Sequence, residues 1–147
     1  HLGVRRQRQM CIRDRQLTYV DHDLDVLIDL GKWWNGRTPN WPMPLGGNVV
    51  RRDLGEDVMR DITKYTKMSI EYALKSPDEA LEFAKAWGRG IDDDTNKEFV
   101  GMYVNDRTID YKEDGRAAIR LFIKEGQHIG MIRNDFDTAT MRFIGEP

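Results

Sequence analysis

Three prolines within six residues divide this chain into two parts. Pro39, Pro42 and Pro44 stand close together in residues 38–44. Proline fixes its own φ angle and keeps the preceding residue out of the helical region, so such a segment is extended and ends any helix before it. The segment predicts a connector, and it is the best candidate for a passage of the chain between two lobes.

The residues on either side of this connector have short apolar runs. Residues 24–30 alternate imperfectly and precede Gly31, which predicts a short, mostly buried strand. Residues 32–34 favour a brief helical turn. Residues 45–50 read as a second strand opened by glycines, which allow another backbone or a ligand to approach closely.

From Asp53 onward the pattern is helical. Asp53 and Glu56 have the spacing of a capping box, in which each side chain satisfies backbone N–H groups of the first turn. Apolar side chains then recur at intervals of three and four, which predicts an amphipathic helix to about Lys75. The stripe consists of Leu54, Val58, Ile62, Tyr65, Ser69 and Tyr72.

Three more helices are predicted after Lys75. A serine–proline pair at 76–77 begins the second, Asp93 or Asp94 caps the third, and the fourth spans residues 113–125 with Gly126 as its stop. The polar tail, residues 134–147, is expected to have little structure. The side chains expected to face inward are Ala80, Leu81, Ala84, Trp87, Phe99, Val100, Tyr103, Val104, Ala118, Ile119, Phe122 and Ile123.

Charge separates the first fifteen residues from the rest. They hold five arginines and one aspartate, a net charge of +4, so the total of −2 leaves −6 for residues 16–147. Residues 6–15 resemble a translated sequencing adaptor, and we exclude residues 1–15 from the interpretation of the fold as an expected artefact. The acidic remainder lacks the electrostatic footprint of a nucleic-acid-binding protein, and no apolar run is long enough for a membrane span.

Candidate metal and catalytic motifs fail on their spacing. Residues 21–25 and 92–96 imitate the start of a calcium loop but lack the required glycine and glutamate further on. His22 and His128 are isolated in polar surroundings, where an exposed side chain is the expected outcome. The single cysteine, Cys11, excludes an internal disulfide and a multi-thiolate metal site. No phosphate-binding or dinucleotide motif occurs, and no cofactor is expected.

Several segments together resemble the 1,4-dihydroxy-6-naphthoate synthase family of the futalosine route to menaquinone. The match runs from Gln16 to about Gly130. It rests on QLTY at 16–19, IDLG at 28–31 with Trp33 and Trp34, MPLGGN at 43–48, RRDLG at 51–55, SIEYAL at 69–74, and YVN at 103–105 with Thr108.

The resemblance implies an α/β fold: the C-terminal part of a two-lobe architecture similar to type II periplasmic binding proteins, predominantly helical as a fragment. Residues 16–38 would complete the smaller lobe and residues 39–44 would cross between lobes. Residues 45–133 would form the C-terminal half of the larger lobe, followed by the tail. We expect the isolated chain to expose apolar side chains around Val26, Ile28, Val49 and Val50.

The resemblance also implies a reaction. The family is a cofactor-free, cytoplasmic lyase that converts the small molecule cyclic dehypoxanthinylfutalosine to 1,4-dihydroxy-6-naphthoate. Its base is a histidine expected immediately before Gln16, where this chain has Ile12, Arg13, Asp14 and Arg15, so we expect an inactive C-terminal fragment without a catalytic residue of its own.

The remaining candidate for substrate contact is the segment Pro44, Leu45, Gly46, Gly47 and Asn48. A conformational switch without ligand contact is the alternative interpretation of that segment. Two other functions stay open: chorismate dehydratase of the same pathway, and a non-catalytic solute-binding protein of the same fold. The oligomeric state is not predicted.

Overall fold

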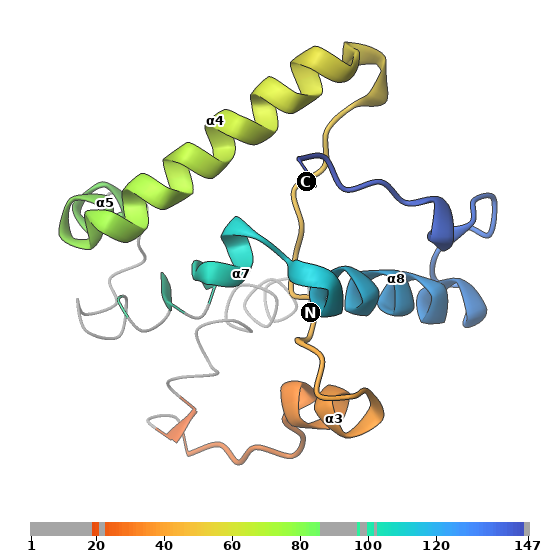
Figure 1. Ribbon diagram of the computed structural model, residues 1–147. Coiled ribbons are helices and arrows are strands. Elements are labelled where there is room, and N and C mark those ends of the chain that lie inside the picture. Colours follow the sequence, from red (N-terminus) through yellow and green to blue (C-terminus); the bar gives the residue numbers. More distant parts are fainter. Residues whose placement is uncertain (1–18, 21–22, 86–96, 98–99, 102, 146–147) are drawn as a thin grey trace, which may run out of the picture.

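The computed structural model describes residues 19–20, 23–85, 97, 100–101 and 103–145, and these are mainly helical (Figure 1). The α-helices are α3 (Leu30–Arg37), α4 (Glu56–Lys75), α5 (Pro77–Lys85), α7 (Asp106–Ile109) and α8 (Lys112–His128). Short 3-10 turns are η2 (Arg52–Leu54) and η3 (Thr138–Thr140). No helix in this part of the chain is both long and apolar enough to cross a membrane.

The two predicted strands are wrong. Residues 24–29 and 45–50 have no regular secondary structure, and the described part of the chain contains no strand. A strand needs a neighbour for its backbone hydrogen bonds, and these ranges supply none. Asp29 instead caps α3, where its Oδ1 accepts from the Lys32 N–H at 3.0 Å. The expected exposure is confirmed for Val26, Ile28 and Val49, of which Val49 is 98% exposed, but it is wrong for Val50, which is half-buried.

The helix predicted from Asp53 begins later, at Glu56, and its capping box is absent. Asp53 lies in η2 and its carboxylate accepts from the Arg51 Nε at 3.0 Å. Gly55 then takes a φ of 82°, a conformation that favours glycine, and serves as the N-cap without a side-chain hydrogen bond. The predicted end at Lys75 is confirmed, as is the start of α5 at Pro77.

The third predicted helix is described only in part. Lys97, Val100, Gly101 and Tyr103 are helical. The predicted cap at residues 93–94, Phe99, and Trp87 on the preceding helix lie outside the described residues, as does the Ala84 side chain.

The fourth predicted helix, α8, continues past Gly126 to His128, so the predicted stop is wrong. The Gly126 carbonyl accepts from the N–H groups of Met131 and Ile132 at 2.9 and 3.1 Å. A Cβ on Gly126 would lie 2.7 Å from the Cδ1 of Ile132. The glycine therefore allows the chain to fold back against the helix rather than ending it.

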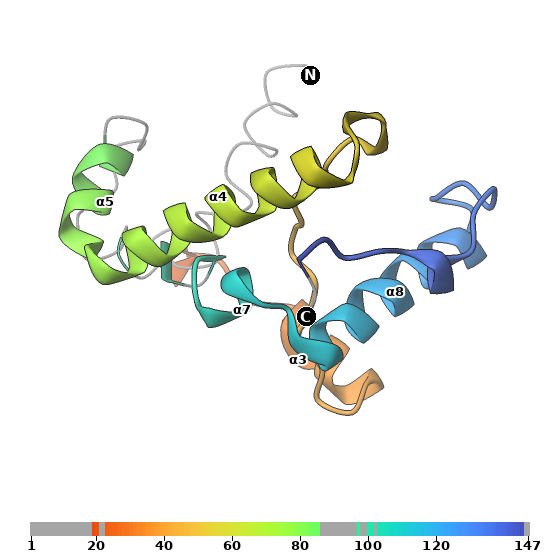
Figure 2. The same cartoon turned by 45° about the horizontal axis from the view of Figure 1, so that its top comes forward.

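The tail has little regular structure, as expected, but it makes contacts with both α4 and α8. Figures 1 and 2 show α4 and α8 as separate arms, with the tail returning from the end of α8 towards the start of α4. Arg142 donates to both carboxylate oxygens of Glu56 at 2.7 and 3.0 Å. Arg120 on α8 donates to the carbonyl of Met141 at 3.2 Å. The tail therefore ties the two arms together.

The described core is small. Its buried apolar side chains are Trp34, Met59, Leu81 and Ala118. Trp34 joins α3 to α8, since its ring meets Phe122 edge to face with centroids 5.7 Å apart. Arg37 strengthens the same contact by pairing with Glu125 at 3.1 Å.

Lys112 starts α8 with a φ of 57°, a left-handed conformation that costs a residue with a Cβ about 1 kcal/mol. Its N–H donates to Asp110 Oδ1 at 2.8 Å, a hydrogen bond that glycine keeps. We expect Lys112→Gly to stabilise the chain by about 1 kcal/mol, measured as a higher denaturant midpoint with an unchanged slope. Glu113→Gly, one residue further into the helix, is the control and should destabilise by a similar amount. A loss of stability in Lys112→Gly would contradict the inference that the backbone of Lys112 is strained.

Candidate functional site

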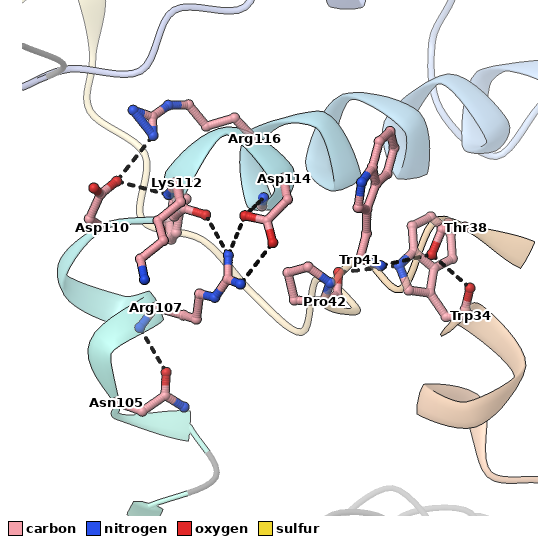
Figure 3. A network of polar contacts seen from close by, with 12 residues as sticks. Trp34, Thr38, Trp41, Pro42, Asn105, Arg107, Asp110, Lys112, Asp114 and Arg116 are labelled. Carbon is pink, nitrogen blue, oxygen red and sulfur yellow. Dashed lines mark hydrogen bonds and ion pairs between the residues drawn. The ribbon is translucent and has the colours of Figure 1, made fainter. Parts of the chain in front are cut away.

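The proline connector is held against the first turn of α8 (Figure 3). The indole Nε1 of buried Trp34 donates to the carbonyl of Pro42 at 3.2 Å. The Pro42 ring packs over Gly115, where an added Cβ would lie 3.9 Å from Pro42 Cγ and 3.2 Å from Tyr111 Cβ. Because Gly115 has no side chain, the Pro42 ring can lie close to α8. This contact fixes the position of the connector next to the segment that follows it.

The five predicted substrate-contacting residues follow directly. Pro44 is half-buried, whereas Leu45, Gly46, Gly47 and Asn48 are exposed in one irregular segment. An added Cβ on Gly47 would lie 3.7 Å from the hydroxyl oxygen of Tyr111, and one on Gly46 would have open space around it. Of these five positions, the glycine contacts therefore place Gly47 beside α8. The segment is accessible, and the sequence-based prediction of its role stays a prediction.

A network of hydrogen bonds centred on Arg107 and Asp114 joins α7 to the same end of α8. Arg107 Nη2 donates to Asp114 Oδ2 at 2.7 Å, its Nη1 donates to Asp114 Oδ1, and Nη1 also donates to the carbonyl of Tyr111 at 3.2 Å. Asn105 caps α7 by accepting from the Arg107 N–H at 2.9 Å, within a capping box completed by Thr108. Figure 3 shows the Arg107 and Asp114 side chains meeting between α7 and α8, with Asn105 at the start of α7.

The Arg107–Asp114 network was not predicted from the sequence. Arg107 and Asp114 are seven residues apart on two different helices, so no helical spacing rule pairs them. The N-x-x-T spacing of Asn105 and Thr108 was the one local signal, since an amide followed by a hydroxyl three residues later can form a reciprocal cap.

Arg107 lowers the pKa of Asp114 below its ordinary value of 3.8, chiefly through their hydrogen bond. A carboxylate with a depressed pKa in the folded state contributes stability that is present above the unfolded value and is lost as pH falls through the folded one. We expect acid below about pH 4 to loosen the α7–α8 junction. Asp114→Asn should lower the melting temperature at pH 7 and have much less effect at pH 2. Asp61→Asn removes the same charge from an exposed position of α4 and serves as control; an equal response in the two variants would contradict the assignment.

The described residues offer no metal site, because no three His, Cys, Asp or Glu side chains gather there. His128 is exposed at the end of α8, as predicted, and His22 lies outside the described residues. Residues 92–96 also lie outside them.

The described part of the chain has two cavities away from the connector. One of about 370 Å³ lies between the start of α4 and the tail, and an apolar one of about 170 Å³ is lined by α4, α5 and four residues of the segment 97–104.

Comparison with known proteins now gives the family. Residues 5–128 match the family described as menaquinone biosynthesis. The chain belongs to the menaquinone biosynthesis family. The match includes the proline connector, the exposed segment after it and the whole of α8, so the candidate site of this family member lies within the matched region.

Two curated relatives of this family member are named 1,4-dihydroxy-6-naphthoate synthase. The one from Thermus thermophilus is 34% identical over 122 residues, which is 83% of this chain and 44% of the relative. The one from Streptomyces coelicolor is 28% identical over 123 residues, 84% of this chain and 43% of the relative. The chain therefore spans less than half the length of either.

A solved structure agrees in fold. A crystal structure of a protein from Archaeoglobus fulgidus superposes with a TM-score of 0.74 at 37% identity, over 80% of this chain and 44% of that one. The helices described above are therefore arranged as in an experimentally determined relative of greater length.

Proposed function

We propose that this chain is the C-terminal part of a 1,4-dihydroxy-6-naphthoate synthase. The observation that carries the proposal is the family match over residues 5–128, with two relatives of that name at 34% and 28% identity. The substrate in this proposal is cyclic dehypoxanthinylfutalosine, and the enzyme is a cytoplasmic lyase of menaquinone biosynthesis.

In the proposed reaction a base takes a proton from the cyclised substrate. The ribose-derived portion then leaves and the new ring becomes aromatic. A base must lie within about 2.6–3.2 Å of the proton it removes, or one water away. We place that base on a histidine just before Gln16, a position at which this sequence has Arg15. Arginine stays protonated at neutral pH and cannot act as a base.

Within the proposed enzyme the exposed segment Pro44, Leu45, Gly46, Gly47 and Asn48 contributes backbone to the substrate cleft. Three observations support this assignment. Trp34 and Gly115 hold Pro42 on α8, Gly47 approaches the Tyr111 hydroxyl, and the open space around Gly46 leaves room for a ligand. Glycines without side chains suit close approach of a flat, polar substrate to the main chain.

We further propose that the whole protein has two α/β lobes similar to a type II periplasmic binding protein. Residues 39–44 form one of the crossings between the lobes. Residues 41–44 have no regular secondary structure, residues 38–40 form a turn with a φ of 59° at Asn40, and Pro42 is anchored at both Trp34 and Gly115. A non-helical segment that is held in this way suits a crossing between lobes.

A turnover assay tests the proposal. The 147-residue chain is incubated with cyclic dehypoxanthinylfutalosine, alone and after co-expression with the N-terminal part of the Thermus thermophilus relative, taken up to the residue that corresponds to Arg15 so that it includes the proposed histidine. We expect no 1,4-dihydroxy-6-naphthoate from the chain alone and measurable formation from the co-expressed pair. Product from the chain alone would overturn the assignment of the base. A well-folded pair that leaves this substrate unchanged would overturn the proposed reaction.

A further inference from the structure

One face of α4 carries a long row of partly exposed apolar and aromatic side chains. Val58, Ile62, Tyr65 and Tyr72 recur at three-, four- and seven-residue intervals, and we call this set the α4 stripe. These four side chains are between 42% and 63% exposed. The helix has 20 residues and is therefore about 30 Å long. Side chains at this spacing lie along one side of a helix, and in α4 the row is interrupted by Ser69.

The buried residue of α4 and the contact of α4 with the tail lie on a different side of the helix. Met59 is the buried residue of the helix, at 4% exposure. Thr63, one turn further, faces the tail, where an added Cβ on Gly145 would lie 3.0 Å from Thr63 Cγ2. Positions 59 and 63 are each one residue beyond a member of the stripe, and one residue turns a helix by about 100°. The tail therefore covers the flank of α4 and leaves the stripe open.

The polar contacts at the stripe lie at its edges. The Tyr72 hydroxyl donates to Glu79 Oε2 at 2.8 Å, and Lys64 Nζ lies 5.8 Å from the centre of the Tyr65 ring. Neither contact covers Val58 or Ile62. Soluble proteins rarely expose an extended apolar band unless another surface packs on it.

We infer that the α4 stripe is the docking surface for the part of the synthase that this chain does not span. The length of the relatives supports this occupant: the chain covers 44%, 43% and 44% of the three proteins described above, so each has more residues outside the match than inside it. The inference rests on the proposed function only in treating the chain as part of a longer synthase.

Co-expression of the full 147-residue chain with the N-terminal part of the Thermus thermophilus relative, taken up to the residue that corresponds to Arg15, tests the inference, with binding measured by titration and by mass in solution. We expect a one-to-one complex. Ile62→Asp should weaken it about a hundredfold, because a buried unpaired carboxylate is costly. Lys67→Gln changes the net charge by the same amount on another side of the helix and should bind as the parent does. Ile62→Leu should also bind normally.

Helix content measured by circular dichroism separates loss of docking from loss of folding, and we expect Ile62→Asp to keep it because Ile62 is already 42% exposed. Three outcomes overturn the inference: no complex, a complex equally tight with Ile62→Asp, or a homodimer of this chain that Ile62→Asp dissociates. Turnover is measured separately. A stripe-dependent complex without turnover would therefore refute the proposed reaction and leave the docking surface intact.

Discussion

Trp34→Ala is expected to cost about 3–5 kcal/mol of unfolding free energy, the usual range for removing a large buried aromatic side chain. Trp34 is 2% exposed, packs edge to face on Phe122 and donates its indole hydrogen to Pro42. The substitution removes all three contributions and leaves the Pro42 carbonyl without this donor. Because the described core is small, we expect α3 and the proline connector to detach from α8, which denaturant titration and hydrogen exchange over residues 30–44 would measure.

Trp33→Ala is the matched control for this prediction. Trp33 is the neighbouring residue on the same helix and is 47% exposed, with the Arg37 guanidinium 5.0 Å from its ring centre. An exposed cation–π contact contributes about 0.5–1 kcal/mol, so the control should lose no more than that. Equal losses in the two variants would show that Trp34 does not anchor the connector.

Gln127→Glu is expected to destabilise the chain by about 2–4 kcal/mol at pH 7, because it replaces two donated hydrogen bonds with repulsion at a buried position. Gln127 is 9% exposed, and its Nε2 donates to the carbonyls of Arg133 and Phe136, both at 3.0 Å. A carboxylate of the same shape cannot donate to either carbonyl. We expect faster hydrogen exchange in residues 129–140, where this side chain fixes the return of the tail.

The pH dependence distinguishes this mechanism from simple loss of packing. A protonated carboxyl can donate one hydrogen bond, so the deficit of Gln127→Glu relative to the parent should shrink as pH falls from 7 to 4. Asn35→Asp makes the same chemical change at an exposed position of α3 and should be nearly neutral. A deficit independent of pH would contradict the role given to the amide.

The sequence predicted the helices well where local chemistry decides them. The connector follows from proline's fixed φ angle, the end of α4 at Lys75 from the interruption of its apolar repeat, and the start of α5 from proline at its first position. These signals act within a few residues and need no tertiary partner. The capping box at Asp53 failed because Gly55, with its positive φ, becomes the N-cap, so α4 begins at Glu56 and Asp53 stays in η2.

The two strand predictions were wrong because a strand, unlike these local signals, depends on a partner from elsewhere in the chain. Residues 24–29 and 45–50 are apolar enough for strands, yet a strand exists only with a neighbour to hydrogen-bond, and the described chain brings none to them. The candidate site likewise has a part that the sequence predicted and a part that it did not. The sequence singled out residues 44–48 from their glycines and from a family resemblance, but it gave no sign of Arg107 and Asp114, which meet across a break between two helices.

By itself, the sequence determined a connector without helix, the end of α4, the start of α5 and the family, because proline geometry, apolar periodicity and motif order are all written along the chain. Only the tertiary structure decided that Pro42 rests on Gly115, that Gly126 admits Ile132 instead of ending α8, and that the tail ties α8 to α4. Each of these depends on which distant residues come within a few ångströms of one another, and packing between elements sets those distances rather than local preference.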